Sequence, residues 1–571
     1  MHGFIAVISF NKPLPLISFN WKPLFPFQKG YIKRSIQYVN LQIEQLTSEQ
    51  FLPDKYWIDT DEFIFVTEGL ITNIDDLLHI HKADDIPSLI SQLYENRENF
   101  FKVFTGNFVG FFFHKKQQIC IAFNNHTATK RLFYFQHSEY LIFSTDLYTL
   151  SKTLSTLHIN KSLDVEAAYL LLTSSFMQDD YTLIKEVKQI RAGEYAIYKE
   201  KKLKLKFYFH LREIKETTDS KEKIISKIDT LFKEAVRSEF EFEKRRGYTP
   251  VTTLSAGLDS RMVALVANDL GYNNQVIFNF SEPGFVEEVV PKQIAEDYGL
   301  KIEQFRLTSG GLLAIEDVVA VNDGLNVYSG ASHAFEAIKA LKIDNIGMIH
   351  TGIIGDAVLG SFLSDTVLQS AKITDGISSK VLLHKAKPIF EKSLANYKNE
   401  VIYKFYNLAY CGDNNGFLFF NLISESTSPF LYPDFLTYAL SIPSKYAYKE
   451  RIYVDWIMTK HPEYARYIWE TIGGKPTNNR LKRFYYRYKR SIIKRLPVQS
   501  MWKKSMAPEQ IWYDSNPSVK LSLDNYLKQN IDKLSFNKEL MGDAVHLYSH
   551  GNIVEKTQVI TLLAAYALHF E

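Results

Sequence analysis

The sequence predicts an α/β protein in two parts, a β-rich first part and a second part built on a parallel sheet. Up to Tyr208, short apolar runs typical of strands alternate with turns: FIAVISF, EFIFVTEG, GNFVGFFFH, QICIAFN, YLIFST and GEYAIY. After the charged stretch HLREIKETTDSKEK, the apolar spacing becomes helical, beginning near Ile224. We therefore expect one domain over residues 1–212 and a second over residues 213–571.

The second part alternates strands and helices in the order expected of a parallel sheet. A run VTTL leads through the turn SAGLDS into the helical segment RMVALVANDL, and a run QVIFNF precedes the helical segment FVEEVVPKQIAEDY. A further run, GMIHT, opens into GIIGD, and the chain beyond about residue 375 has mostly helical spacing. Because such sheets bind ligands at the carboxyl ends of their strands, we expect the functional site at these turns.

Size and composition fit this organisation and exclude some classes of protein. The 571 residues are too many for one core, and 46% hydrophobic with 23% charged residues is ordinary for a globular chain. Lys and Arg number 67 against 64 Asp and Glu, which gives no reason to expect a nucleic-acid partner. Cys120 and Cys411 lack the spacing of a zinc site and fit a reducing compartment. With no basic leader and no apolar run of bilayer length, we expect a cytoplasmic protein without a membrane span.

The first turn has the features of a phosphate-binding loop. It contains Ser255, Ala256, Gly257, Leu258, Asp259 and Ser260. Its small residues let backbone N–H groups approach a pyrophosphate, and its hydroxyls and the following helix N-terminus supply donors and a positive dipole. The loop lacks the GK[ST] ending of a Walker A motif, which disfavours γ-phosphoryl transfer. The structural alternative is an ordinary turn with an N-capping Ser or Asp.

A second glycine turn, TGIIGD, ends the later strand and contains Thr351, Gly352 and Asp356. Two aspartates at neighbouring strand ends, Asp259 and Asp356, can share one Mg²⁺, and the metal neutralises departing pyrophosphate. Considered alone, Asp356 is a typical turn residue.

These motifs resemble those of the asparagine synthetase type B family. SAGLDS resembles the family's SGGLDS, TGIIGDAVLGSF its SGEGxDExFGGY, and ESTSPFLY (425–432) its ExRxPFLD, while EGLITN, GNFVGFFFH and NNHTATKRLFY resemble segments of its glutaminase domain. The resemblance implies an N-terminal αββα sandwich of the Ntn-hydrolase type and a C-terminal ATP-binding domain of the PP-loop type with a helical C-terminal part. It also implies ATP at Ser255–Ser260, Thr351 and Gly352, and Mg²⁺ at Asp259 and Asp356.

Departures from the family pattern fall in both parts. Family glutaminase domains begin Met-Cys-Gly and use the cysteine as nucleophile, whereas residue 2 here is His. Glu68, Leu70 and Asn107 also differ from the family residues of that site, so we expect a degenerate domain without glutaminase activity.

In the second part, Ile353 and Ala357 replace acidic residues of the family motif, which leaves Glu425 as the candidate to accept the amine's proton. The alternative for Glu425 is a structural partner of a buried Arg or an N-cap.

The family also implies a lysine that stabilises charge on the α-phosphate and the tetrahedral oxyanion. Lys475, in WETIGGKPT, is the preferred candidate, with Lys503 and Lys504 as competitors. From Arg480 to Lys504 the chain has ten Lys or Arg, no acid and one apolar stripe, which predicts an amphipathic basic helix. That helix is either a solvated face or a docking site for an acidic peptide or partner protein.

The resemblance implies an ATP-dependent carbon–nitrogen ligase that forms AMP and pyrophosphate from a small-molecule or peptide carboxylate and an amine. Three versions stay open: asparagine formation from aspartate and ammonia, closure of a lactam as in β-lactam synthetases, and closure of a peptide ring as in lasso-peptide cyclases. A non-catalytic nucleotide-binding partner protein is the alternative from another class.

Overall fold

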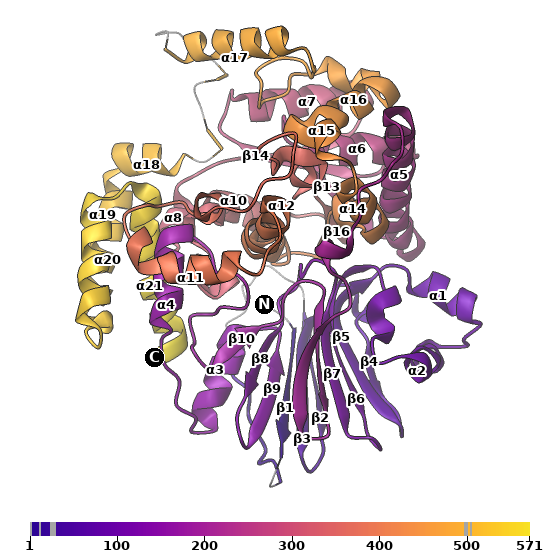
Figure 1. The fold of residues 1–571 in the computed structure, drawn as a ribbon, viewed down its shortest axis with the longest axis vertical. Helices are drawn as coiled ribbons and strands as arrows, with labels where there is room; N and C mark the ends of the chain where they lie inside the picture. Colours follow the sequence, from indigo (N-terminus) through magenta and orange to yellow (C-terminus); the bar gives the residue numbers. More distant parts are fainter. Residues whose placement is uncertain (1–2, 11–12, 23–29, 496–500, 503–504, 507) are drawn as a thin grey trace.

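The first part of the chain forms two stacked antiparallel sheets (Figure 1). The structure is a computed structural model, and it describes residues 3–10, 13–22, 30–495, 501–502, 505–506 and 508–571. The strand orders are β10-β8-β9-β1-β3-β2 and β12-β11-β7-β6-β5-β4. The sheets meet through apolar side chains such as Phe4, Val66 and Phe111. Their strands are β1 (Gly3–Ser9), β2 (Tyr31–Gln37), β3 (Leu41–Ser48), β4 (Trp57–Asp59), β5 (Phe63–Ile71), β6 (Gly106–His114), β7 (Ile119–Asn124), β8 (Phe133–Gln136), β9 (Tyr140–Ser144), β10 (Val187–Gln189), β11 (Glu194–Lys199) and β12 (Lys202–Phe207).

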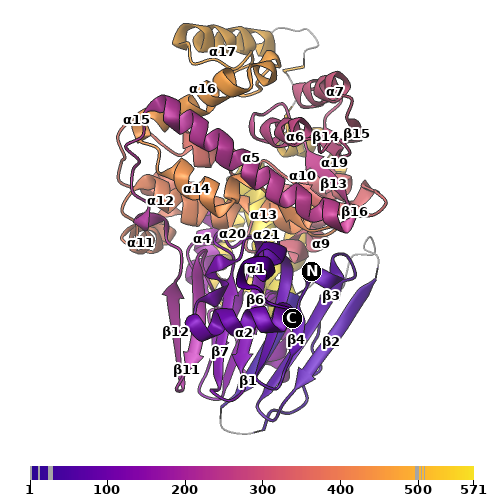
Figure 2. The ribbon, with the colours of Figure 1, turned by 90° about the vertical axis from the view of Figure 1, so that its right-hand side faces the viewer.

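Helices cover the outer faces of both sheets. α1 (Ile74–His81) and α2 (Ile86–Asn96) pack on the sheet that contains β5 (Figure 2). α3 (Leu147–Thr156) and α4 (Val165–Ser174) pack on the sheet that contains β1. The layers are therefore helix, sheet, sheet and helix, which matches the expected αββα sandwich. The last helix of the chain, α21 (Ile553–Phe570), shares the core of α3 and α4 and so packs against both parts of the protein.

The second part contains a five-stranded sheet in which all strands are parallel, as predicted. Its order is β15-β14-β13-β16-β17. The strands are β13 (Thr249–Thr253), β14 (Val276–Ser281), β15 (Lys301–Arg306), β16 (Ile346–His350) and β17 (Ser426–Thr427). The chain first adds strands on one side of β13 and then returns to the other side with β16. This change of direction places the ligand crevice of such sheets at the carboxyl ends of β13 and β16.

Helices cover both faces of this sheet. α5 (Lys221–Arg246), α6 (Asp259–Asp269) and α7 (Val286–Tyr298) share a core on one face, and α8 (Gly310–Leu313), α9 (Ile315–Asn322), α10 (Ser329–Ala340) and α13 (Asn415–Phe420) lie on the other. The remaining helices are α11 (Leu383–Leu394), α12 (Glu400–Lys404), α14 (Pro433–Leu440), α15 (Ser444–Ala447), α16 (Arg451–Lys460), α17 (Arg480–Arg495), α18 (Glu509–Ser515), α19 (Pro517–Asn530) and α20 (Lys538–His550). Within the described ranges, no helix has the length and apolar character needed to cross a bilayer.

Strands β2, β3 and β15 were not predicted from the sequence, because many of their side chains are polar. In β3, Gln42 and Gln45 are buried, and each makes hydrogen bonds to backbone atoms elsewhere in the chain. Gln42 exchanges hydrogen bonds of 2.9 and 2.8 Å with the backbone of Ile17, and Gln45 donates to the carbonyl of Thr67 at 2.9 Å. Hydrogen bonds between residues far apart in the sequence stabilise buried polar side chains, but they leave no local signal in the sequence.

A buried histidine fixes α5 against the sheet. His350, the last residue of β16, is fully buried, with Nδ1 3.1 Å from Oε2 of Glu239 and Nε2 2.6 Å from Oε2 of Glu243. The ring of Phe240 stacks on the imidazole at 3.9 Å between centroids. Burial alone would lower the pKa of His350, but Glu243 and Glu239 outweigh burial and raise it to about 9. The imidazolium is thus the stable form in the folded protein at neutral pH.

The raised pKa of His350 predicts a loss of stability in mild alkali. Its contribution is fully present below the unfolded pKa of about 6.5 and is lost as the pH rises through about 9, a change of about 1–3 kcal/mol. Urea midpoints followed by circular dichroism at pH 6.5 and 9.5 should fall more in the wild type than in His350→Gln. The exposed His384→Gln serves as the control and should follow the wild type. Parallel declines in wild type and His350→Gln would contradict the assignment.

Candidate functional site

The loop from Ser255 to Ser260 is closed by its own hydroxyls. The backbone N–H of Ser255 donates to Oγ of Ser260 at 2.9 Å, and the two serine hydroxyls lie 3.0 Å apart. The N–H of Gly257 donates to Oγ of Ser255 at 3.1 Å. These bonds hold the loop in a tight curve directly before α6, so the helix N-terminus faces the space above the strand ends.

The side chains of Glu287 and Arg261 both bind the backbone of Ala256 in this loop. Oε2 of Glu287, from α7, accepts the N–H of Ala256 at 2.6 Å, and the buried guanidinium of Arg261 donates to the Ala256 carbonyl at 3.0 Å. Arg261 also donates to the carbonyls of Tyr464 and Ile468, which ties the loop to the segment before Lys475. Burial raises the pKa of Glu287 to about 7, even though the bond from Ala256 favours the carboxylate. Ala256 and Leu258 are buried and serve as structural members of the loop, with the Ala256 N–H already occupied.

The second loop lies against the first, and two glycines make this contact possible. A Cβ on Gly352 would lie 2.5 Å from the backbone N of Ser260, and one on Gly355 would lie 2.7 Å from Cγ of Asp259. Between them Ile354 has a left-handed backbone (φ 70°) and a buried side chain. The hydroxyl of Thr351 donates to the carbonyl of Thr427 at 3.0 Å, which fixes the start of the loop on β17. Asp259 and Asp356 are thereby held at one end of the same cavity.

Four acids gather at this point: Asp259, Asp356, Asp413 and Glu450. Burial and then the charges of Asp356 and Glu450 raise the pKa of Asp259 well above its usual range. Burial and Asp356 likewise raise the pKa values of Asp413 and Glu450 to about 7. One oxygen of Asp259, Oδ1, is buried and accepts no hydrogen bond in the described part of the structure. Crowded carboxylates with an unused oxygen donor fit a hard divalent cation such as Mg²⁺.

The two loops border a cavity of about 870 Å³. Its lining includes seven of the predicted binding residues, namely Ser255, Gly257, Asp259, Ser260, Thr351, Gly352 and Asp356. It also includes apolar side chains, among them Phe176, Phe278, Phe280, Leu408, Phe419 and Phe420. Among the described residues that line the cavity there is no Lys or Arg.

Asp413, Glu450, Glu287 and His333 were not among the site residues predicted from the sequence. Asp413, Glu287 and His333 line the cavity, where burial lowers the pKa of His333 to about 4. Asp413 and Glu450 lie in segments without a recognisable motif and meet the aspartates of the two loops only in the folded chain. Glu287 lies in the predicted helical segment FVEEVVPKQIAEDY, and in the structure its carboxylate accepts the N–H of Ala256.

The structure does not bring Lys475 into the cavity. Lys475 is exposed and does not line it, because the loop is closed by pairing of Trp469 with Gly474 and leaves the next side chain in solvent. Lys503 and Lys504 lie outside the described residues. Near them, the carbonyl of Met501 accepts the N–H of Val286 at 3.2 Å, and Met506 lines the cavity.

Glu425 is not placed to act as a base in this cavity. Its carboxylate is buried, with Oε1 3.3 Å from Nζ of Lys55 and Oε2 2.8 Å from Nζ of Lys130. Lys55 also pairs with Glu68 at 3.2 Å. Burial would lower the pKa of Lys55, but Glu68 and Glu425 outweigh burial and raise it. The structure thus supports the structural alternative for Glu425, with lysines of the first part as partners in place of the expected Arg or N-cap.

Glu68, Leu70 and Asn107, which also differ from the family pattern, are engaged in structural contacts. Glu68 accepts hydrogen bonds from Gln45 at 3.1 Å and Thr47 at 3.2 Å, and Leu70 is buried. Nδ2 of Asn107 donates to the backbone carbonyl of Ser426, in β17, at 2.5 Å. The Asn107 bond holds the first part against the parallel sheet.

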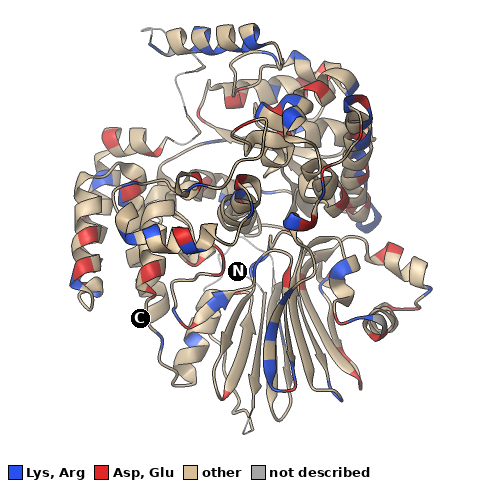
Figure 3. Ribbon diagram, in the orientation of Figure 1, with Lys and Arg blue, Asp and Glu red and all other residues tan. Residues whose placement is uncertain are grey.

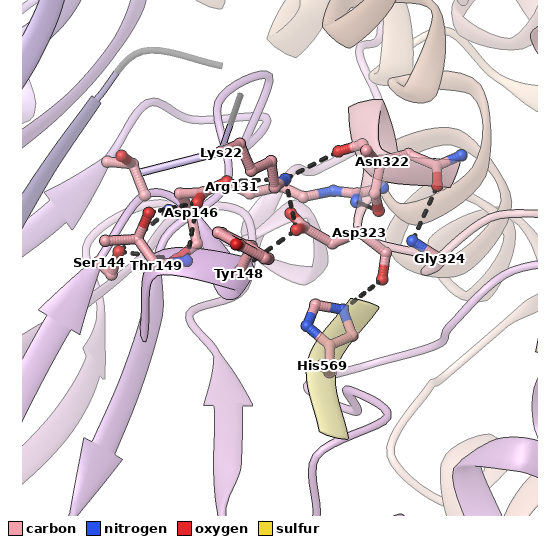
Figure 4. Close-up of polar contacts among 12 residues, drawn as sticks. Lys22, Arg131, Ser144, Asp146, Tyr148, Thr149, Asn322, Asp323, Gly324 and His569 are labelled. Carbon is pink, nitrogen blue, oxygen red and sulfur yellow. Dashed lines mark hydrogen bonds and ion pairs between the residues drawn. The ribbon is translucent and has the colours of Figure 1, made fainter. Parts of the chain in front are cut away.

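A second buried group of charges crosses the same junction (Figure 4). Nζ of Lys22 lies 2.7 Å from Oδ1 of Asp146 and 2.5 Å from Oδ1 of Asp323, and all three side chains are almost fully buried. Arg131 donates to the carbonyl of Asn322 at 2.7 Å, and the carbonyl of Asp323 lies 2.9 Å from Nε2 of His569. The group therefore connects the stacked sheets, the end of α9 and the last helix.

Comparison with known proteins finds a relative for the first part. Residues 56–209 match the family model described as a glutamine amidotransferase domain. No curated protein sequence matches the chain.

Two solved structures align weakly. The glutamine phosphoribosylpyrophosphate amidotransferase from B. subtilis complexed with ADP and GMP has 9% identity and a TM-score of 0.20, over 46% of this chain and 51% of that one. A structure of the allosteric regulatory enzyme of purine biosynthesis has 6% identity and a TM-score of 0.21, over 53% of this chain and 59% of that one. The alignments thus span between half and three fifths of those chains, and only the family match identifies the first part as similar to a glutamine amidotransferase domain.

Removal of the Glu425 carboxylate should destabilise the protein. Glu425→Ala leaves Lys55 and Lys130 buried without this partner, and breaking a buried pair in this way costs about 3–5 kcal/mol. Glu391→Ala removes the exposed pair with Lys387 and should cost less than about 1 kcal/mol. Thermal and urea unfolding of both variants measure the difference. A Glu425→Ala protein of wild-type stability with lost activity would instead indicate a catalytic role.

Proposed function

We propose that the chain is an ATP-dependent amide-bond synthetase that forms AMP and pyrophosphate and has no glutaminase activity. One observation carries the proposal: the two glycine loops meet at the carboxyl ends of β13 and β16, with Asp259 and Asp356 facing one cavity. The glutamine amidotransferase family match in the first part supports a relation to amidotransferase-type synthetases. In this proposal, a substrate carboxylate attacks the α-phosphorus of ATP, pyrophosphate leaves, and an amine converts the acyl-adenylate to an amide and AMP.

The residues of the first loop suit the triphosphate. The hydroxyls of Ser255 and Ser260 and the N-terminus of α6 supply donors and a positive dipole at the cavity. Asp259 and Asp356 would hold Mg²⁺. Two observations support this assignment: Oδ1 of Asp259 accepts no hydrogen bond among the described residues, and the pKa of the Asp259 carboxyl is raised. When bound, Mg²⁺ supplies positive charge that stabilises the pyrophosphate leaving group.

The cavity favours an apolar substrate with an organic amine over aspartate with ammonia. A second carboxylate, as in aspartate, calls for a cation, and the described lining contains none. The lining also contains several aromatic and aliphatic side chains, and Ile353 adds to them where the family has an acid. Its 870 Å³ volume is that of a site for a whole small molecule or the end of a peptide. Formation of a lactam or a peptide ring fits these properties better than formation of asparagine.

The proposed loss of glutaminase activity rests on the residues found at positions where the family has its glutaminase residues. Glu68 is used in ion pairing, Leu70 is buried and Asn107 binds the backbone of β17. Residue 2, the position of the family nucleophile, is His and lies outside the described residues. Glutamine therefore should not replace the amine substrate.

Substitution of Asp259 should separate metal binding from folding. Because the pKa of Asp259 is raised in the folded state, its ionised form destabilises the free protein at neutral pH, and Asp259→Asn should raise the melting temperature without ligand. The same variant should bind ATP with Mg²⁺ at least about tenfold more weakly. Asp344→Asn, at the other end of β16, is the matched control and should change neither quantity. Unchanged Mg²⁺-dependent ATP affinity in Asp259→Asn would contradict the metal site.

The products of ATP turnover test the reaction class. Purified protein with ATP, Mg²⁺ and a panel of carboxylates should exchange labelled pyrophosphate into ATP before any amine is added, because adenylation precedes amide formation. Apolar and N-acylated amino acids should support exchange better than aspartate. Formation of ADP and phosphate would exclude the mechanism. ATP binding without exchange for any carboxylate, including peptides, would favour the non-catalytic nucleotide-binding alternative.

A further inference from the structure

Helix α17 lies apart from the rest of the protein at one extremity. Figures 1 and 2 show it in both views as the outermost helix at the top, running across the long axis. Its contacts with the described residues of the body lie along one side: the Tyr486 ring packs where a Cβ on Gly474 would lie, Arg490 pairs with Glu470, and Arg483 donates to the Thr477 carbonyl. Tyr486 and Ile493 are the apolar side chains of this inner face.

The outer face of α17 is an exposed apolar ridge. Its members are Leu481, Phe484, Tyr485, Tyr488 and Ile492, with exposed fractions of 81%, 70%, 58%, 58% and 40%. At 3.6 residues per turn these positions fall on one side of the helix, opposite Arg483, Tyr486, Arg490 and Ile493. Leaving five such side chains in water on one helix is unfavourable unless another surface covers them.

Positive charges border the ridge on both sides. The helical angle places Arg480 and Arg487 along one flank and Lys482 and Lys489 along the other, and all four are exposed. The helix contains no Asp or Glu, so Figure 3 shows blue without red along it. An apolar ridge with cations on both flanks is the pattern of a helix that lies in the plane of a bilayer surface, where the cationic side chains reach up to the headgroups.

We propose that α17 docks the protein onto an anionic lipid bilayer, with its ridge among the acyl chains and its two cationic flanks on the headgroups. The ridge is convex and stands clear of the body, so it fits a deformable planar surface. An acidic peptide or partner protein would instead need a groove complementary to a single protruding helix. Tyr485 and Tyr488 suit the interface, since each combines an apolar ring with a polar tip. This docking does not depend on the proposed ligase reaction.

Sedimentation of the full chain with vesicles tests this proposal. Binding should be clear with vesicles of phosphatidylcholine containing about one third phosphatidylserine, and much weaker with pure phosphatidylcholine. Phe484→Ser with Tyr488→Ser should reduce binding at least about tenfold. Lys482→Glu with Lys489→Glu should reduce it by about fivefold or more for each cation, with a weaker effect at high salt.

Matched controls lie elsewhere on the surface. Leu521→Ser removes an exposed apolar side chain of α19, and Lys202→Glu with Lys204→Glu reverses two exposed lysines of β12. Neither should change vesicle binding, and all variants should keep the wild-type melting temperature because the substituted side chains are exposed. Equal binding of wild type and the α17 variants to vesicles would overturn the proposal. Absence of vesicle binding, with α17-dependent binding of a polyglutamate peptide, would overturn it in favour of an acidic protein partner.

Discussion

Four carboxyl groups lie close together at the carboxyl ends of β13 and β16, and the chemistry of the candidate site depends on what offsets their mutual repulsion. The close packing of Gly352 and Gly355 against the first loop brings Asp259 and Asp356 together, and Asp413 and Glu450 add to the charge. The described lining supplies no Lys or Arg to offset these acids. A divalent cation would relieve the repulsion, and the donors of the first loop would then suit the phosphates that accompany it.

The buried charges at the junction between the two parts differ from the acids of the candidate site, because those named here are paired with opposite charges of the protein. Glu425 lies between Lys55 and Lys130, and Lys22 lies between Asp146 and Asp323. Removing one member of such a set is costly, whereas the complete set holds the parts in a fixed register. Glu68 and Asn107, which differ from the residues of the family that the sequence resembles, contribute to this junction. Buried polar contacts thus join the first part to the parallel sheet.

The sequence was most informative where the signal is local. Apolar runs predicted β5, β6 and β13. The two glycine turns predicted a set of residues that line the cavity. It was least informative where distant residues satisfy one another: β3 is a buried strand rich in polar residues, and no spacing reveals that Glu425 meets Lys55 and Lys130. Asp413 is an unremarkable residue of the segment CGDNNG until the fold brings it beside Asp356. The ridge of α17 was visible as a helical stripe, but only the structure shows that the stripe faces solvent.

Anomalous diffraction from crystals grown with Mn²⁺ and a non-hydrolysable ATP analogue would test the central claim most directly. The account predicts a Mn²⁺ peak between the carboxylates of Asp259 and Asp356, with the phosphates of the analogue on the loop from Ser255 to Ser260. Another group of possible ligands, Asp269, His461 and Glu463, has ligand atoms within 4.8 Å of one another and provides an internal comparison. A peak at that group, with none at Asp259 and Asp356 and no nucleotide on the loop, would contradict the account.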